Sequence, residues 1–280
     1  MEISVMPYVT PRLVSDPKSC DWYHTMEIPG YGLVEGRWDL RGRVDAYLGG
    51  INLTGKRVLE LGPASGYLTF EMERRGAEVV AYDLSEEQSW DCVPMASHPY
   101  ARHHAERRKV HIRRLNDGFW LAHHAFQSKA KVVYGDIYSI PTNIGLVDVA
   151  VFGAILLHLR DPFLGLEHAL RLTRETAVVV DLAPWDGLSD GAMHFLPDSH
   201  ARGPLETWWR FTPGAIQRML GVLGFESAQV SSCTAPCMGT EHTLFTVVAQ
   251  RTKPPLDLRS TQPSPKFPFG SAASARRGRL

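Results

Sequence analysis

A glycine turn between two apolar runs is the feature that most constrains this chain. The stretch Val58-Leu59-Glu60-Leu61-Gly62-Pro63-Ala64-Ser65-Gly66 joins a short apolar run, Arg57 to Leu61, to an amphipathic segment, Tyr67 to Arg75. The run is typical of a buried strand, and the segment favours a helix packed on a sheet. A second strand, Glu78 to Asp83, ends in an acid. Because glycine lets a ligand approach the backbone closely, the pattern predicts a β-α-β unit that binds a nucleoside-bearing cofactor.

The glycine spacing distinguishes two classes of cofactor. A dinucleotide fingerprint reads G-x-G-x-x-G and receives a pyrophosphate at the helix N-terminus. Ala64 and Tyr67 break that pattern here, and Glu60 beside the turn would repel a pyrophosphate. Glu60 suits the cationic amino end of S-adenosylmethionine (SAM), and Asp83 can accept two hydrogen bonds from a ribose diol. The alternative is an ordinary β-α-β unit whose glycines serve only the turn.

Three further strands are expected, at Lys131 to Ile137, Val147 to Ala154 and Ala177 to Leu182. The last two are nearly continuous in apolar residues, which suits parallel strands covered on both faces. Asp136 is expected to accept the adenine amino group while Ile137 packs on the ring. The alternative for Asp136 is a helix N-cap or turn acid.

The order of these segments resembles the class I SAM-dependent methyltransferases. More narrowly, it resembles the branch similar to the tRNA wobble-uridine 5-oxyacetate (carboxymethyl)transferases, over roughly residues 20 to 250. The narrower likeness is carried by Trp22-Tyr23-His24, Phe70-Glu71-Met72-Glu73-Arg74-Arg75-Gly76-Ala77, Gly135-Asp136-Ile137-Tyr138 and Leu157-His158-Leu159-Arg160-Asp161-Pro162. The resemblance implies an α/β, Rossmann-like domain, with a mostly parallel seven-stranded sheet and helices on both faces. The residues that hold the extra carboxylate of a carboxymethyl donor cannot be placed, and the long N-terminal domain of the RNA-acting enzymes is missing. Ordinary SAM is therefore the expected donor.

Cofactor and substrate residues follow from this plan. The predicted cofactor-binding residues are Glu60, Gly62, Pro63, Gly66, Asp83, Leu84, Asp136, Ile137, Phe152 and Gly153. The acceptor is expected to contact an aromatic and polar set, namely Trp22, Tyr23, His24, Asn116 and Trp120. Aromatic walls suit a sugar, a planar ring or a stacked base, although each aromatic residue alone also fits core or lid packing.

His158 is the candidate catalytic base, because it follows the fourth strand, where reacting groups lie in an open α/β sheet. The alternative is a histidine that hydrogen-bonds the backbone and shapes the cofactor pocket. Asp161 before Pro162 is better explained as the N-cap of the next helix. No metal site is predicted: the place after the fourth strand lacks acids, and Cys233 and Cys237 form a lone pair.

Composition limits the range of functions. Lys+Arg and Asp+Glu number 30 each, which argues against a strong polyanion binder, although a local basic patch is possible. Hydrophobic content of 44% with 21% charged residues is typical of a globular protein, and no apolar run is long enough to span a bilayer. With no signal peptide and no disulfide framework, we expect a cytoplasmic location and no membrane partner.

Three regions are predicted: an N-terminal arm and cap (1–50), a SAM-binding methyltransferase domain (51–251) and a disordered tail (252–280). Within the domain, we expect a helix within 37–48, a polar connection over 84–115, a helix over 118–128 and a lid insertion at about 184–210. A helix over 213–224 and an antiparallel pair over 226–232 and 242–250 complete the fold. The favoured function is SAM-dependent methylation of a small molecule or glycan, at oxygen. The alternatives are a tRNA wobble-uridine modifying transferase and a non-catalytic SAM-binding protein. The sequence leaves the oligomeric state open.

Overall fold

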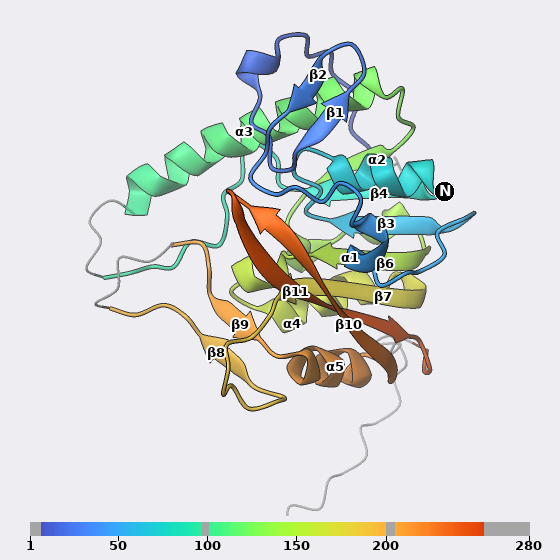
Figure 1. Cartoon of the computed structure of the whole chain (residues 1–280), viewed down its shortest axis with the longest axis vertical. Helices are drawn as coiled ribbons and strands as arrows, with labels where there is room; N and C mark the ends of the chain where they lie inside the picture. The colour runs from blue at the N-terminus through green and yellow to red at the C-terminus, as the bar shows by residue number, and fades with distance from the viewer. Residues whose placement is uncertain (1–6, 97–100, 200–204, 255–280) are drawn as a thin grey trace, which may run out of the picture.

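A single twisted sheet organises the molecule (Figure 1). The computed structural model describes residues 7–96, 101–199 and 205–254. In these residues the sheet has seven strands in the order β10-β11-β7-β6-β3-β4-β5. They are β3 (Arg57–Leu61), β4 (Glu78–Asp83), β5 (Lys131–Tyr134), β6 (Val147–Gly153), β7 (Thr173–Leu182), β10 (Ser227–Cys237) and β11 (Thr240–Gln250).

The strand order reverses at β3. This strand pairs in parallel with both β4 and β6, while β5 extends the sheet beyond β4 and β7 extends it beyond β6. In an open parallel sheet, ligands bind outside the carboxyl ends of the strands at such a reversal. β11 is antiparallel to β7 and β10, as expected for the last two strands. The predicted mostly parallel sheet is confirmed.

Successive residues of the inner strands pack on opposite faces of the sheet, as the alternation of side chains along a strand requires. In β3, Val58 belongs to one hydrophobic cluster and Leu59 to the other; in β7, Val178 and Val179 divide in the same way. Both faces are apolar because helices cover both, which explains why β6 and β7 read as continuous apolar runs.

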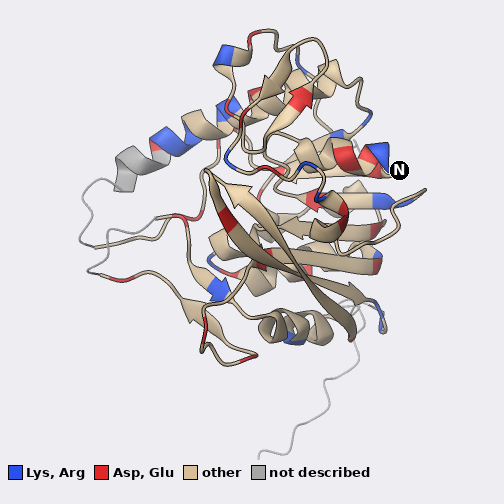
Figure 2. Ribbon diagram, in the orientation of Figure 1, with Lys and Arg blue, Asp and Glu red and all other residues tan. Residues whose placement is uncertain are grey.

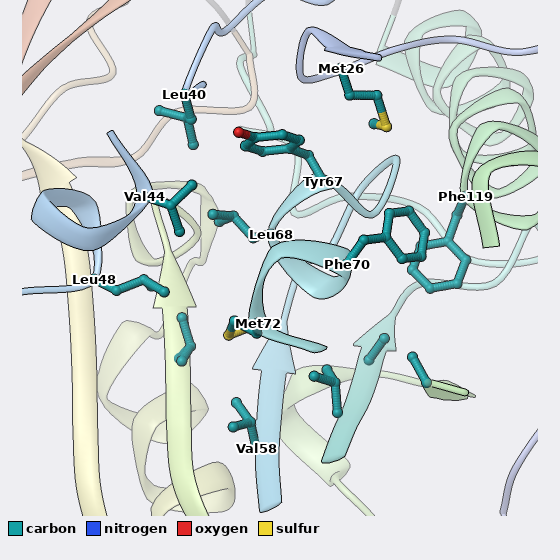
Figure 3. Packing of buried hydrophobic residues seen from close by; sticks show 14 of the residues in the cluster. Met26, Leu40, Val44, Leu48, Val58, Tyr67, Leu68, Phe70, Met72 and Phe119 are labelled. Atoms are coloured by element: carbon teal, nitrogen blue, oxygen red, sulfur yellow. The ribbon is translucent and has the colours of Figure 1, made fainter. Parts of the chain in front are cut away.

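The first cluster is covered by α1 (Val44–Tyr47), α2 (Tyr67–Arg74) and α3 (Ala101–Ala125). Figure 3 shows Val44 beside Leu68, and Phe70 against Phe119, whose ring centroid lies 5.5 Å away. The second cluster is covered by α4 (Pro162–Leu170) and α5 (Pro213–Val222). The predicted placement of helices on both faces is confirmed.

Two small sheets flank the central one. The N-terminal region contains the 3-10 turn η1 (Pro17–Ser19) and the hairpin of β1 (Met26–Ile28) and β2 (Gly32–Val34), whose Met26 and Ile28 enter the first cluster. β8 (Met193–Phe195) and β9 (Trp209–Phe211) form an antiparallel pair between β7 and α5, within the predicted lid insertion. Three further 3-10 turns follow β5 and β6, namely η2 (Ile137–Ser139), η3 (Thr142–Ile144) and η4 (Leu156–His158).

The prediction of a polar connection over residues 84–115 was wrong in its second half. α3 begins at Ala101, well before the expected helix start at residue 118, and ends at Ala125. Arginine, lysine, glutamate and alanine are good helix formers, so a stretch dense in them favours a helix even where it is polar. Ile112, Leu115 and Phe119 supply the buried stripe at helical spacing.

Two shorter elements also differ from the prediction. The helix expected within residues 37–48 is the single turn α1, since Gly42 adopts a left-handed φ of 72° before it. β5 ends at Tyr134 instead of residue 137, because Gly135 and Asp136 leave the strand to start η2. The tail predicted from residue 252 lies outside the described residues from position 255 onward.

Candidate active site

A cavity of about 350 Å³ lies at the carboxyl ends of β3, β4, β5 and β6, beside the reversal of strand order. Its lining combines the residues that follow each of these strands with residues of the connection after β4 and of α3. The described lining residues are Tyr23, Leu61, Gly62, Ala64, Tyr82, Asp83, Leu84, Gln88, Ser89, Trp90, Asp91, Ile112, Leu115, Asn116, Gly135, Asp136, Ile137, Tyr138, Gly153, Ala154, Ile155, His158 and Leu159.

The turn after β3 needs its first glycine for two reasons. Gly62 has a left-handed φ of 76°, and a Cβ added there would lie 2.7 Å from the Ile155 side chain. Ala64 also has a positive φ of 51°, which residues other than glycine rarely adopt. Its N–H donates a hydrogen bond to Asp83 Oδ2 at 3.1 Å. The turn is therefore fixed to the end of β4 by a hydrogen bond that the strained conformation allows.

Asp83 ends β4 and lines the cavity. Its Oδ1 accepts from the Leu84 N–H at 2.7 Å, and its Oδ2 accepts from the Ala64 N–H. Burial raises the pKa of Asp83 to about 6, against the lowering effect of these two N–H groups. A carboxylate oxygen has two lone pairs, so each oxygen keeps one for a ligand hydroxyl. Asp83, which the sequence predicts to bind a diol, is thus a carboxylate whose orientation is already fixed. Its contact with a ribose remains a prediction.

The residues after β5 form the next part of the wall. A Cβ on Gly135 would lie 2.2 Å from the Tyr82 hydroxyl, which donates to the Asp136 carbonyl at 2.9 Å. The Asp136 side chain caps η2 by accepting from the Tyr138 N–H at 2.9 Å, which confirms the N-cap interpretation. Asp136 and Ile137 both line the cavity, and their contact with adenine remains a prediction.

Glu60 lies outside the described lining, beneath α2. It is 2% exposed and accepts a hydrogen bond from the Thr69 hydroxyl. Burial raises the pKa of Glu60 to about 8, although Thr69 acts to lower it. The carboxyl group is therefore mostly protonated at neutral pH before any ligand binds. A cationic ligand group nearby would favour its ionised form.

Three other predicted cofactor residues are not part of the described lining. Pro63 accepts from the Gly66 N–H at 2.8 Å, which closes the turn. A Cβ on Gly66 would lie 2.7 Å from the Phe70 ring. Phe152 is fully buried in the second cluster. The remaining members of that predicted set, Gly62, Leu84 and Gly153, line the cavity.

The predicted substrate residues divide into two groups. Tyr23 and Asn116 line the cavity, and Asn116 donates to the Leu84 carbonyl at 3.1 Å. Trp22, His24 and Trp120 lie behind them. Trp120 is 2% exposed and donates through Nε1 to the Tyr134 hydroxyl at 2.9 Å.

Burial dominates the chemistry of His24, lowering its pKa to about 3. The adjacent Trp22 packs against the first cluster. His24 is therefore buried and Trp22 half-buried against the core, whereas Tyr23 between them lines the cavity.

His158 ends η4 and lines the cavity. Its Nδ1 lies 2.5 Å from the Glu206 carbonyl oxygen, in the insertion after β7. A carbonyl only accepts, so Nδ1 carries the ring proton and Nε2 carries the lone pair. Burial lowers the pKa of His158 to about 4, and the nearby Arg108 acts in the same direction. At neutral pH the ring is uncharged and can take a proton at Nε2.

Sequence reasoning missed the cavity residues Trp90 and Asp91. They lie in the connection after β4, between Asp83 and α3. The Asp91 carboxylate accepts from the Tyr138 hydroxyl and from the Arg160 N–H at 2.9 Å through Oδ2. The connection after β4 leaves the carboxyl end of a strand next to the reversal, where ligands bind. The Trp-Asp pair that follows Asp83 in this connection was therefore a sequence signal for residues of the cavity.

No protein-family model matches the sequence, and neither does any curated protein. Solved structures are similar in fold. The N-terminal domain of EvdMO1, in the presence of S-adenosylhomocysteine (SAH) and D-fucose, has a TM-score of 0.50 and 18% identity over 84% of this chain and 93% of that chain. The chain has the class I methyltransferase fold.

Two other structures show the same range of similarity. Magnesium protoporphyrin IX methyltransferase from Synechocystis with bound SAH has a TM-score of 0.49 and 16% identity, over 76% of this chain and 82% of that one. A putative methyltransferase from Bacillus halodurans has a TM-score of 0.49 and 11% identity, over 74% of this chain and 98% of that one.

Two general features complete the description of this methyltransferase fold. In the described ranges, no group of three or more His, Cys, Asp or Glu residues is arranged to hold a metal ion. None of the helices in those same ranges is both long enough and apolar enough to cross a membrane.

Proposed function

We propose that this protein is a SAM-dependent methyltransferase that methylates an oxygen of a small molecule or glycan. The observation that carries the proposal is the fixed Asp83 carboxylate at the cavity wall, beside the glycine turn at the reversal of strand order. Two hydrogen-bonded N–H groups orient its oxygens and leave lone pairs for a diol. Two proteins of similar fold have been solved with SAH, the demethylated form of SAM, which agrees with this cofactor.

The residues of the cavity fit SAM in chemistry. Asp83 would bind the ribose, Asp136 and Ile137 would bind the adenine, and Gly62 leaves room for the ligand against the backbone. Glu60, buried beneath α2, would respond to the positive charge of the amino end by favouring its ionised form. When bound, SAM supplies a methyl group on a sulfonium, which an incoming oxygen attacks in line.

His158 is the proposed base for that oxygen. An alcohol that attacks a methyl group must lose its proton, and a positioned imidazole can accept it at Nε2. The Glu206 carbonyl holds the tautomer with the proton on Nδ1, which leaves the lone pair of Nε2 to accept the proton. The structural role of His158 in joining η4 to the insertion coexists with this catalytic one.

Calorimetric titration with SAM tests the cofactor assignment, and SAH is titrated as a second ligand. Asp83→Asn keeps an oxygen for one of the two N–H groups but removes the charge, and Asp83→Ala removes both acceptors. Asp45→Ala is the matched control, because the Asp45 side chain is 82% exposed and forms a surface ion pair with Arg75. We expect binding by the wild type and by Asp45→Ala, and weaker binding by both Asp83 variants. No binding by the wild type would remove the proposal.

The alternative of a tRNA wobble-uridine modifying transferase is favoured by one observation. Basic residues gather along α3 (Figure 2), including the exposed Arg107 and Arg113. Binding of tRNA that weakens steeply with added salt, and that Arg107→Ala with Arg113→Ala reduces, would support this alternative. SAM binding without transfer to alcohols, sugars or tRNA would instead support a non-catalytic role.

A further inference from the structure

One end of the cavity is formed by residues that have no role in holding the cofactor in the proposed arrangement. Trp90 and Asp91 come from the connection after β4, Tyr138 from η2 and His158 from η4. The Trp90 and His158 ring centroids are 5.8 Å apart. The Tyr138 hydroxyl donates to the Asp91 carboxylate. Because Trp90 and Asp91 are neighbours in the chain, the Trp90–His158 pair and the Asp91–Tyr138 pair lie next to each other. The candidate base therefore shares this end of the cavity with an aromatic ring and a carboxylate.

These side chains are held in place from several directions. The Trp208 indole donates to the Asp91 carbonyl at 2.6 Å, and the Arg108 guanidinium lies 4.9 Å from the centre of the Trp90 ring. Arg108 also pairs with Glu206, the residue whose carbonyl binds His158. The wall is thus preorganised by contacts from α3 and from the insertion, which reduces the cost of ordering it around a ligand.

The charge of the lining is one-sided. Asp83, Asp91 and Asp136 are the acids of the described lining, and none of its residues is a lysine or an arginine. Two arginines near this end already have partners. Arg108 pairs with Glu206, and the Arg160 guanidinium lies 5.3 Å from the centre of the Trp208 ring. A carboxylate or phosphate on the acceptor would lie beside the Asp91 carboxylate, and the Arg108 guanidinium over the Trp90 ring is already paired with Glu206, so the desolvation of the acceptor anion would be poorly compensated.

Asp91 offers a specific contact for the opposite kind of ligand. Its two donors, the Tyr138 hydroxyl and the Arg160 N–H, both bind Oδ2, and Oδ1 retains its lone pairs. A ligand hydroxyl or ammonium can donate to Oδ1, while the apolar face of a ring packs on Trp90.

We propose that the Trp90–Asp91 end of the cavity is the acceptor site and that it takes an uncharged or cationic sugar, with Asp91 selecting against negative charge. This inference rests on the proposed function, since the acceptor oxygen must reach His158. It names hydroxylated rings without carboxylate or phosphate as the acceptor class. It also assigns substrate contacts to two residues that the sequence prediction did not include.

The test measures binding of three sugars of different charge to the wild-type protein saturated with SAH. The probes are glucosamine (cationic), methyl glucoside (neutral) and glucuronate (anionic), and binding is followed by calorimetry at neutral pH. We expect glucosamine and methyl glucoside to bind at least about tenfold more tightly than glucuronate, the scale of one charge-assisted contact. Asp91→Asn should remove most of the preference for glucosamine over glucuronate. Glu87→Gln, which removes an equal charge from an exposed position on the same connection, should leave it unchanged.

A second pair of variants guards against misfolding at Asp91. Trp90→Ala should weaken the binding of all three sugars alike, because each loses the packing of its ring on Trp90. Trp90→Phe should bind them more tightly than Trp90→Ala, because it restores an aromatic ring. Equal or tighter binding of glucuronate by the wild type would overturn the inference. Failure of both glucosamine and methyl glucoside to bind the SAH complex would overturn it too. If SAH itself does not bind, the proposed function fails, and the two failures are thereby distinguished.

Discussion

The Nδ1 atom of His158 and the backbone carbonyl oxygen of Glu206 lie 2.5 Å apart, although 48 residues separate them in the chain. The contact joins η4, at the end of β6, to the insertion after β7. It fixes both the tautomer and the orientation of the imidazole. Because a backbone carbonyl is the partner, substitution of the Glu206 side chain does not remove the acceptor, and the catalytic prediction is best tested on the histidine itself.

Replacement of His158 by Gln should lower kcat by about 10²–10⁴-fold while SAM affinity changes little, because general-base catalysis is lost and the cofactor wall is kept. The measurement is single-turnover methyl transfer at saturating SAM, paired with calorimetry. An equal loss of SAM binding and of turnover would show that His158 only shapes the pocket.

The pH dependence of kcat offers a separate test of His158. Its pKa is lowered to about 4 by burial, from an ordinary value of 6.5, so the neutral base persists as the pH falls through 6.5. We expect kcat at saturating SAM to fall only as the pH approaches about 4. Folding stability declines earlier, as the pH falls from about 6.5 to about 4, since the unfolded chain binds the proton first. Circular dichroism at each pH separates the two effects.

Cofactor affinity should have its own pH dependence through Asp83. Burial raises the pKa of this carboxyl from 3.8 to about 6, so part of it is protonated below that value in the free protein. A ribose diol donates to the ionised form, and SAM affinity should therefore fall as the pH falls through about 6. Calorimetric titrations across this range should show the trend in the wild type, whereas Asp83→Asn should bind weakly with no step near 6.

Much of this fold follows from the local pattern of the sequence. The glycine turn, the acids that end β4 and follow β5, and the apolar runs of β6 and β7 each carry their own signal within a few residues. The start of α3 was missed because arginines and histidines were interpreted as a solvated connection, whereas helix propensity and the stripe of Ile112, Leu115 and Phe119 decide its structure. Propensity and periodicity together would have corrected that prediction.

The site was less predictable, since its contacts join residues far apart in sequence. Nothing near His158 indicates that Glu206 would be its partner, and nothing near Asp91 indicates that Tyr138 and Trp208 would hold it. Trp120 and His24 have residue types suited to a substrate wall, but the packing of α3 and of the N-terminal segment buries them. Which face a side chain presents is decided by tertiary packing, and a single sequence does not encode it locally.

Gly135 provides a test of the cavity wall that is independent of charge. A Cβ at this position would lie 2.2 Å from the Tyr82 hydroxyl, so Gly135→Ala must displace Tyr82 or the start of η2. We expect a loss of about 1–3 kcal/mol in the free energy of unfolding, typical of overpacking, together with weaker SAM binding. Chemical denaturation and calorimetry measure the two effects.

Gly221→Ala is the matched control: nothing lies within 4 Å of a Cβ there, inside α5, and the variant should gain about 0.5–1 kcal/mol in the free energy of unfolding from reduced backbone entropy. Unchanged stability and binding in Gly135→Ala would mean that the wall after β5 yields freely and does not shape the cofactor site.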